Sequence, residues 1–231
     1  MSVFAIGDIH GEGARLEALL AALPRGPKDT TVFLGDYIDR GPDSAGVVRR
    51  ILEEYDAATD RTILLWGNHE DMAAAHFGFE APSGFDYDPY DWFGNGGFAA
   101  LASFGYPSPA EAFGAPCPPE LERLFPLLRL FWRAPDDVIY VHAGVPAGKR
   151  PEETPASLLL WTRAEDNDTS GRLVVHGHTP QSGGTPDVRA NRINLDTGAV
   201  FGGPLSALQL PERHLYLAHP DGSATTRPIL L

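Results

Sequence analysis

The sequence predicts a layered α/β fold that carries an inserted, mainly helical cap. Short apolar runs with the length of a buried strand recur along the chain, and each ends in a polar residue or a glycine. Segments with helical periodicity lie between the first three runs, which gives a β-α-β-α-β start. A stretch rich in proline, glycine and aromatic residues then interrupts the pattern. The predicted strands are residues 3–6, 31–34, 62–65, 138–141 and 173–175.

The helices follow from the spacing of apolar residues. Four leucines share one face of the first predicted helix, and the second is expected to open at Pro42 with an acidic first turn. In the cap, helices are predicted near residues 71–77, 97–104 and 119–130, and no strand is expected between residues 80 and 135. Strands and turns return in residues 193–231. We therefore expect one domain over residues 1–231, with residues 72–135 as an insertion. The residues that carry the two helical patterns are Leu16, Leu19, Leu20 and Leu23, followed by Val47, Val48, Ile51 and Leu52.

Composition restricts the partners and the compartment. A formal net charge of −13 disfavours a nucleic-acid polymer or an anionic membrane as a partner, although metal ions or a few arginines can reverse the potential locally. The single Cys117, in a proline-rich segment that suggests an exposed loop, excludes an intrachain disulfide. No apolar stretch approaches the roughly 18 residues of a membrane span, and the first residues lack the pattern of a signal peptide. These features predict a cytoplasmic protein, and they leave its oligomeric state open.

Polar motifs follow the predicted strands. They read "GDIHG" at 7–11, "GDYIDRG" at 35–41, "GNHE" at 67–70, "VHAG" at 141–144 and "HGHT" at 176–179. Ligands of open α/β sheets bind at the carboxyl ends of the strands, so these motifs are expected to converge in one crevice. Each motif alone has a structural explanation, such as a helix cap, a turn or a hydrogen-bonded loop. Five of them, all ending apolar runs, are hard to explain as independent coincidences.

The donor set predicts a site for divalent metal ions. Aspartate, histidine and asparagine suit Mn2+, Fe2+ or Zn2+, and the near absence of cysteine excludes a thiolate zinc site. The donors are too many for one ion. Two ions roughly 3.5 to 4 Å apart that share a carboxylate would use them.

The motifs "GDIHG", "GDYIDRG" and "GNHE", followed by "VHAG" and "GHT", resemble the phosphoprotein phosphatase family of binuclear metallophosphoesterases. The resemblance covers residues 3–72 and 138–200, and "GNHEDM", "NGG" and "NLDTGAVFGGPLSAL" look most like small bacterial members, which include lambda-type protein phosphatases and diadenosine tetraphosphate hydrolases. It implies a four-layer α/β/β/α sandwich of mixed sheets with an inserted helical cap. The implied cofactors are two divalent ions, with Mn2+ expected and Fe2+, Fe3+ or Zn2+ as alternatives.

Carried over to this sequence, the resemblance implies that the first ion binds Asp8 and His10 and that Asp36 bridges both ions. The second ion would bind Asn68, His142 and the histidine directly before the threonine of "HGHT", which is His178. His176 is then left beside the ligands without binding the metal, or is simply the last residue of a strand. We favour the former.

The resemblance also implies roles in the reaction. Asp39 would support a protonated His69, which protonates the leaving alkoxide or stabilises its charge. Arg40 and Arg163, the latter in "WTRAE", would bind the phosphate. For Arg163, simple packing on an aromatic neighbour is the alternative. The implied mechanism is in-line attack by a metal-bridging hydroxide without a phosphoenzyme, in which Cys117 has no part.

Three further residues are candidates for the surroundings of the site. Asp196 in "NLDTG" is expected to orient a ligand histidine or to form a strand-ending turn. Trp92 and Asn95 in the cap are candidates for lining the substrate entrance, and core packing is an equal alternative for Trp92.

The sequence thus predicts a metal-dependent phosphatase of the serine/threonine protein phosphatase type, with activity on small aryl phosphates. The alternative is a diadenosine tetraphosphate (dinucleoside polyphosphate) hydrolase that uses the same centre, because the difference between the two lies in what the cap presents. A non-catalytic binding module would be expected to have lost a ligand or His69, and none is lost. A nuclease is disfavoured by "GDYIDRG" and by the acidic composition.

Overall fold

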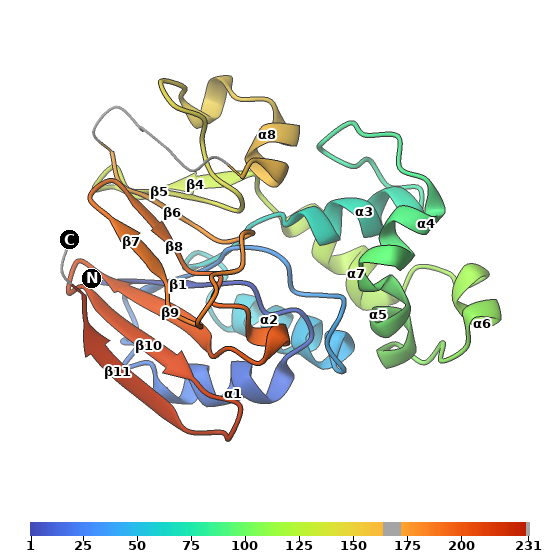
Figure 1. Ribbon diagram of the computed structural model, residues 1–231, viewed down its shortest axis with the longest axis horizontal. Coiled ribbons are helices and arrows are strands. Elements are labelled where there is room, and N and C mark those ends of the chain that lie inside the picture. The colour runs from blue at the N-terminus through green and yellow to red at the C-terminus, as the bar shows by residue number, and fades with distance from the viewer. Residues whose placement is uncertain (164–171, 230–231) are drawn as a thin grey trace.

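The computed structural model describes residues 1–163 and 172–229, and in that part of the chain two β-sheets lie face to face (Figure 1). The first sheet has six strands in the order β11-β10-β9-β1-β2-β3, and the second has five in the order β4-β5-β6-β8-β7. The strands of the first are β1 (Val3–Ile6), β2 (Thr30–Phe33), β3 (Thr62–Leu64), β9 (Leu205–Leu210), β10 (His214–Ala218) and β11 (Ala224–Pro228). Those of the second are β4 (Phe131–Arg133), β5 (Ile139–Val141), β6 (Val174–His176), β7 (Asp187–Arg189) and β8 (Arg192–Asn194).

Strands β1, β2 and β3 are buried on both faces, which explains why they read as continuous apolar runs. β1 pairs with β2, and β2 with β3, in parallel. Alternate side chains of a strand point to opposite faces of its sheet. In β1, Phe4 and Ile6 pack in the core beneath the helices, whereas Ala5 packs in the core between the two sheets. Both sheets are mixed, because β9 pairs with β1, and β4 with β5, in antiparallel orientation.

Helices cover the outer faces of the sheets, so the predicted four-layer α/β/β/α sandwich is confirmed. Helices α1 (Gly13–Ala22) and α2 (Ser44–Ala57) lie on the six-stranded sheet. On the five-stranded sheet, the short helix α8 (Ala156–Trp161) packs Leu159 against Ile139 and Val141 of β5. None of the helices in the described ranges is long and apolar enough to cross a membrane.

The segment between β3 and β4 forms the helical projection on the right of Figure 1. Its elements are α3 (Asn68–His76), α4 (Pro89–Trp92), the segment η1 (Phe93–Gly97) with a kink at Gly96, α5 (Phe98–Ser103), α6 (Pro109–Phe113), α7 (Pro119–Leu124) and the 3₁₀-helix η2 (Phe125–Leu127). Apolar residues of this projection, such as Leu101 and Leu121, belong to the same buried cluster as Val48 and Leu52 of α2. The cap therefore shares its core with the body of the protein.

Several local expectations are corrected by the structure. Strand β4 lies at residues 131–133, where no strand was expected, because three residues at a sheet edge are too few to show alternation. Helix α2 begins at Ser44 and not at Pro42, since the Asp43 side chain caps it by accepting the Gly46 N–H at 2.9 Å.

The other corrections concern several short elements and the burial of one side chain. Strand β7, α4, α6, α8 and the 3₁₀-helices η3 (Pro151–Glu153) and η4 (Ala199–Phe201) were not anticipated. Cys117, expected to be exposed, is half-buried against the core, and burial raises the pKa of its thiol to about 12. Residues 230 and 231 of the last expected strand lie outside the described ranges.

Candidate metal centre

The carboxyl ends of β1, β2, β3, β5 and β6 lead into loops that lie together. The N–H groups of Ile9 and His10, after β1, donate to the carbonyl oxygen of Asp36, after β2, at 3.0 and 2.8 Å. The Gly177 N–H, after β6, donates to the carbonyl oxygen of His142, after β5, at 2.7 Å. The predicted convergence of the motifs is therefore what the structure shows.

Left-handed backbone is concentrated in these loops. Among the described residues, seven non-glycine residues have a positive φ, and five of them are predicted site residues: His10, Asp36, Asp39, Arg40 and His178. This conformation costs roughly 1 to 2 kcal/mol for a residue with a side chain, and such strain clusters at functional sites. The backbone thus points to the same residues as the motifs, by an independent route.

The first cluster of candidate ligands contains His10, Asp36 and His69, whose ligand atoms all lie within 4.8 Å of one another. His10 Nδ1 donates to the Ile38 carbonyl oxygen at 2.8 Å, so the lone pair of the neutral ring is on Nε2, 3.5 Å from Asp36 Oδ2. Burial, followed by the charge of Arg40, lowers the pKa of His10 to about 3. The ring is therefore neutral near pH 7, which is the form that binds a metal.

The second cluster contains Asp36, His142 and His178, within the same 4.8 Å limit. His142 Nδ1 donates to the Leu34 carbonyl oxygen at 2.9 Å, which leaves the Nε2 lone pair facing Asn68 Oδ1 at 3.0 Å and Asp36 Oδ1 at 3.4 Å. His178 Nδ1 lies 2.8 Å from the same Asn68 oxygen. Burial lowers the pKa of His142 to about 4. Neutral nitrogen and oxygen acceptors that converge in this way fit a divalent cation.

Asp36 belongs to both clusters. Its Oδ2 faces His10, and its Oδ1 faces His142 and also accepts the His69 N–H at 3.1 Å. The side chain is buried, and burial raises its pKa to about 7. A carboxylate whose two oxygens face two separate sets of donors has the arrangement needed for sharing between two ions.

Asp8 and Asp196 add negative charge beside the two clusters. Asp8 Oδ2 accepts the His178 N–H at 2.9 Å, and its Oδ1 is buried without a hydrogen-bond partner in the described part of the chain. Burial, followed by the charges of Asp196 and Asp36, raises the pKa of Asp8 well above its usual range. Gly177 is required here, because a Cβ at this position would lie 1.9 Å from Asp8 Oδ1. An orphaned carboxylate oxygen among other buried carboxyls also fits a cation.

Of the two expectations for Asp196, the contacts match the strand-ending turn, because its carboxyl accepts the Gly198 N–H at 3.0 Å and lies against Asp8. Burial raises the pKa of Asp196 to about 7. Its contribution to the site is thus through charge and through the turn that it closes.

His69 and Asp39 form the expected pair. His69 Nδ1 lies 2.6 Å from Asp39 Oδ2, while His69 Nε2 is buried, without a hydrogen-bond partner among the described residues, and 4.0 Å from Asp36 Oδ2. The indole N–H of Trp92 donates to both Asp39 oxygens, at 3.1 and 2.9 Å. Burial, followed by the charge of His10, lowers the pKa of His69. Trp92 is 1% exposed, so it contacts Asp39 from the core and does not line an entrance.

Glu70 is a residue whose role sequence reasoning missed. Its carboxylate accepts the backbone N–H groups of Asp36 at 2.8 Å, Tyr37 at 2.9 Å and Gly67 at 3.1 Å. It thereby ties the start of α3 to the loop that presents Asp36. The signal was present in "GNHE", because a glutamate at the third position of a helix commonly bonds back to the helix start.

The two predicted phosphate-binding arginines lie at different depths. Arg40 is partly buried, its guanidinium NH1 lies 2.6 Å from His10 Nε2, and its Cζ lies 5.6 Å from the centre of the Phe201 ring. Arg163 is exposed after α8. Burial, followed by the charges of His142 and Arg163, lowers the pKa of His178. The next two residues of its motif, Ala164 and Glu165, lie outside the described ranges.

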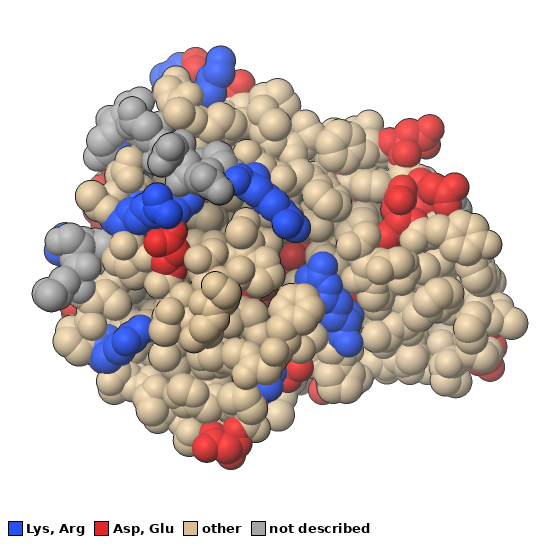
Figure 2. Space-filling model, in the orientation of Figure 1, with Lys and Arg blue, Asp and Glu red and all other residues tan. Residues whose placement is uncertain are grey.

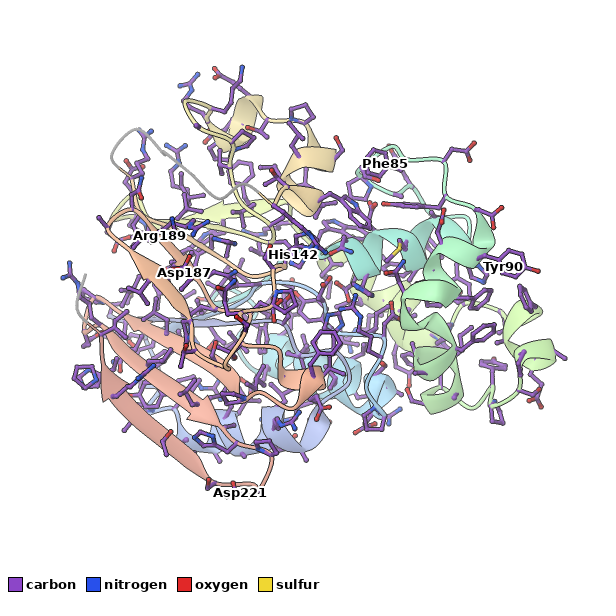
Figure 3. The ribbon with its side chains drawn as sticks, viewed as in Figure 1. Phe85, Tyr90, His142, Asp187, Arg189 and Asp221 are labelled. Carbon is purple, nitrogen blue, oxygen red and sulfur yellow. The ribbon has the colours of Figure 1, made fainter. Side chains whose placement is uncertain are left out.

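Figure 2 shows Lys and Arg side chains around the middle of this face, and most of the exposed acidic residues toward its rim. His142, labelled in Figure 3, lies in the interior between the sheets and the cap. An overall acidic chain thus presents a locally basic approach to a buried acidic centre, which suits an anionic substrate.

The two remaining candidates, His176 and Asn95, do not belong to either cluster of candidate ligands. His176 ends β6; its Nδ1 lies 3.0 Å from the Gly177 carbonyl oxygen, and its Nε2 has no hydrogen-bond partner within the described ranges. Asn95 donates from its side chain to the Asp91 carbonyl oxygen at 2.8 Å, which stabilises its own helical turn.

Comparison with known proteins agrees with this site. The family model of calcineurin-like phosphoesterases matches residues 1–202. The chain is 33% identical over 215 residues to serine/threonine-protein phosphatase 1 of Salmonella typhimurium, covering 90% of this chain and 91% of that protein. It is 27% identical over 248 residues to the asymmetrical bis(5'-nucleosyl)-tetraphosphatase PrpE of Oceanobacillus iheyensis, covering 92% and 90%.

Among solved structures, the fold is similar to the cold-active protein-tyrosine phosphatase of a psychrophilic Shewanella species. The TM-score is 0.62 at 18% identity, over 97% of this chain and 80% of the other. The match to the family model over most of the chain, together with the complete set of motifs around Asp36, shows that this protein is a member of the calcineurin-like metallophosphoesterase family.

Proposed function

We propose that the protein is a metal-dependent phosphatase that hydrolyses phosphomonoesters, with phosphoserine and phosphothreonine in proteins as its substrate class. The observation that carries the proposal is the position of Asp36, whose Oδ2 faces His10 and whose Oδ1 faces His142. A shared carboxylate between two sets of neutral donors is the core of a two-ion phosphoester hydrolase. The relative at 33% identity is named as a serine/threonine-protein phosphatase.

The proposed ligands are Asp8 and His10 for a first ion, Asp36 for both ions, and Asn68, His142 and His178 for a second. We propose Mn2+, since its preference for oxygen and imidazole nitrogen matches this set. Two bound divalent ions lower the pKa of the attacking water and neutralise charge on the phosphoryl oxygens.

The proposed role of His69 is to supply a proton from Nε2 to the leaving oxygen as the P–O bond breaks and water oxygen bonds to phosphorus. Burial lowers the pKa of His69, so this role depends on groups that favour the imidazolium. Asp39, 2.6 Å from Nδ1, is one such group, and the arriving phosphate dianion is another. Arg40 and Arg163 are proposed to bind the non-reacting phosphate oxygens.

A dinucleoside polyphosphate hydrolase is the second candidate, and the aromatic surroundings of the site favour it. Phe201 is 66% exposed beside Arg40 and borders a cavity of about 270 Å³ that Thr197 and Pro180 also line. The Trp161 ring lies 6.1 Å from that of His178, and the exposed ring of Phe85, labelled in Figure 3, lies 6.3 Å from Trp161. Exposed rings near a phosphate site could stack on nucleobases.

The deciding experiment measures kcat/KM with Mn2+ on 4-nitrophenyl phosphate, a phosphothreonine peptide and diadenosine tetraphosphate. We expect turnover of both monoesters, loss of activity on chelation, and loss in Asp36→Asn. A higher kcat/KM on the dinucleotide than on either monoester would replace the main proposal by the second. Failure of every divalent ion to support turnover would reject both.

Two further points belong to this proposal. We propose residues 72–135 as a cap within a single domain that spans residues 1–231. We also propose the cytoplasm as its compartment, because the lone Cys117 suits a reducing environment.

A further inference from the structure

The cap contacts the Asp39–Arg40 turn at two points. Trp92, the last residue of α4, donates its indole N–H to both carboxylate oxygens of Asp39. Gly96, at the kink within the η1 segment that follows, accepts the backbone N–H of Arg40 at 3.4 Å. Both contacts come from one short segment, residues 92–97.

The turn that receives these contacts is strained. Asp39 and Arg40 are consecutive left-handed residues, with φ of 76° and 65°, and both carry full side chains. Two adjacent residues of this kind persist only where surrounding contacts hold them. Ser44 Oγ accepts the Asp39 N–H at 3.0 Å from the body of the protein, and the cap supplies the contacts named above.

The glycines of the segment fit this arrangement closely. A Cβ on Gly97 would lie 2.8 Å from the Trp92 indole, so glycine is needed to seat that ring. Gly96 has φ of 114°, and a Cβ there would lie 2.6 Å from the Arg40 backbone nitrogen. Gly94 differs, because a Cβ there would meet no atom within 4 Å.

We propose that Trp92, Gly96 and Gly97 form a positioning clamp, in which Trp92, seated against Gly97, fixes the Asp39 carboxylate that orients His69 and Gly96 fixes the backbone of Arg40. The clamp acts through Asp39 and Arg40 and does not itself touch the substrate. This inference rests on the proposed function, since it assigns a purpose to the cap in the protonation of the leaving group.

The effect proposed for Trp92 depends on the burial of the Asp39 carboxylate, which is shielded from water. Asp39 and His69 are both fully buried, so water does not replace a lost donor. With the indole N–H removed, the carboxylate keeps His69 as its side-chain partner but loses the contact that fixes its rotation. His69 Nε2 would then be aimed less well at the leaving oxygen.

The test compares leaving groups in Trp92→Phe, which removes the N–H and keeps an aromatic ring. The alkoxide of threonine needs a proton as it leaves, whereas 4-nitrophenolate is a far weaker base and needs the proton less. We expect kcat on the phosphothreonine peptide to fall roughly 10- to 100-fold, with a much smaller fall on 4-nitrophenyl phosphate and little change in KM for either. Trp132→Phe, in a ring that packs on Tyr140 in the other sheet, is the matched control and should preserve the ratio of the two rates.

The glycines provide a second series that leaves every side chain of the pair intact. Gly97→Ala should reproduce the leaving-group effect of Trp92→Phe, and Gly96→Ala should raise KM for both substrates by disturbing Arg40. Gly94→Ala should behave as the parent protein does. If Trp92→Phe does not fold, the comparison of Gly97→Ala with Gly94→Ala carries the test.

A readout without turnover checks the contact itself. The indole N–H signal that Trp92→Phe removes from the ¹H–¹⁵N spectrum should exchange slowly and should shift in Asp39→Asn. An unshifted signal, or equal losses of both substrates' rates in Trp92→Phe and Gly97→Ala, would overturn the clamp. Loss of all phosphatase activity in the unmodified protein would instead reject the proposed function.

Discussion

At the scale of single residues, the two histidines of "HGHT" differ in the groups that their rings contact. Gly177 allows the chain to turn between them, and His178 takes a left-handed conformation with φ of 68°. Its Nδ1 then lies 2.8 Å from Asn68 Oδ1, in the second cluster. His176 instead ends β6 and contacts the Gly177 peptide. Sequence spacing alone could not distinguish them, because the turn depends on Asp8 filling the space beside Gly177.

His178→Ala is therefore expected to lower kcat by orders of magnitude and to reduce the bound metal, since it removes a proposed ligand. His176→Ala should cost only roughly 10-fold, because it acts through the Gly177 peptide. Metal content by elemental analysis and kcat on 4-nitrophenyl phosphate measure both effects. His214→Ala, in β10, is the control. Normal metal content in His178→Ala together with metal loss in His176→Ala would reverse the assignment.

At the scale of elements, the strands that carry motifs were predictable and the connecting pieces were not. The runs at β1, β2 and β3 are buried on both faces, so their apolar character is continuous and visible. Strands β4 and β7 are short edge strands whose residues are half exposed, and α8 has six residues, which is less than two turns. Such pieces depend on tertiary contacts that a periodicity does not record. The kink at Gly96 within η1 is likewise explained by the contacts of Gly96 and Gly97, and not by local preference.

The start of α3 depends on Glu70, which leads to a prediction about stability. Glu70→Gln would place an amide NH2 among backbone N–H groups that now donate to a carboxylate, and it would leave buried donors unpaired. We expect the free energy of unfolding to fall by about 3 kcal/mol, and metal affinity to fall because Asp36 loses its support. Urea unfolding and calorimetric Mn2+ titration measure the two effects. Glu53→Gln, an exposed change on α2, should alter neither, and equal behaviour of the two variants would contradict the assigned role.

At the scale of the whole molecule, the family and the site motifs were visible in the sequence, while the electrostatic design was visible only in three dimensions. The net charge of −13 describes the chain as a whole. The fold separates this charge into a buried acidic centre and an approach with Arg40 and Arg163 beside it. Burial raises the pKa of the carboxyls of Asp36 and Asp196 and lowers the pKa of His10 and His142. The stability of the metal-free protein should therefore depend on pH.

Burial raises the folded-state pKa of Asp36 and Asp196 to about 7, from an unfolded value of about 3.9. The folded state therefore holds extra protons between these values, and stability falls as pH rises through them. His10 and His142, with pKa lowered to about 3 and about 4, have the opposite effect, which is complete by the unfolded value of about 6.5.

Above about pH 6.5 only the carboxyl effect continues, so Tm of the chelated protein should fall toward about pH 8. Mn2+ bound by Asp36 would take the place of its proton, so the rise in Tm on adding Mn2+ should be larger at about pH 8 than at about pH 6.5. Thermal unfolding with Mn2+ or with a chelator measures this, and Asp36→Asn should show a weaker pH dependence. An equal rise in Tm at about pH 6.5 and about pH 8 would mean that the Asp36 carboxyl does not face the metal.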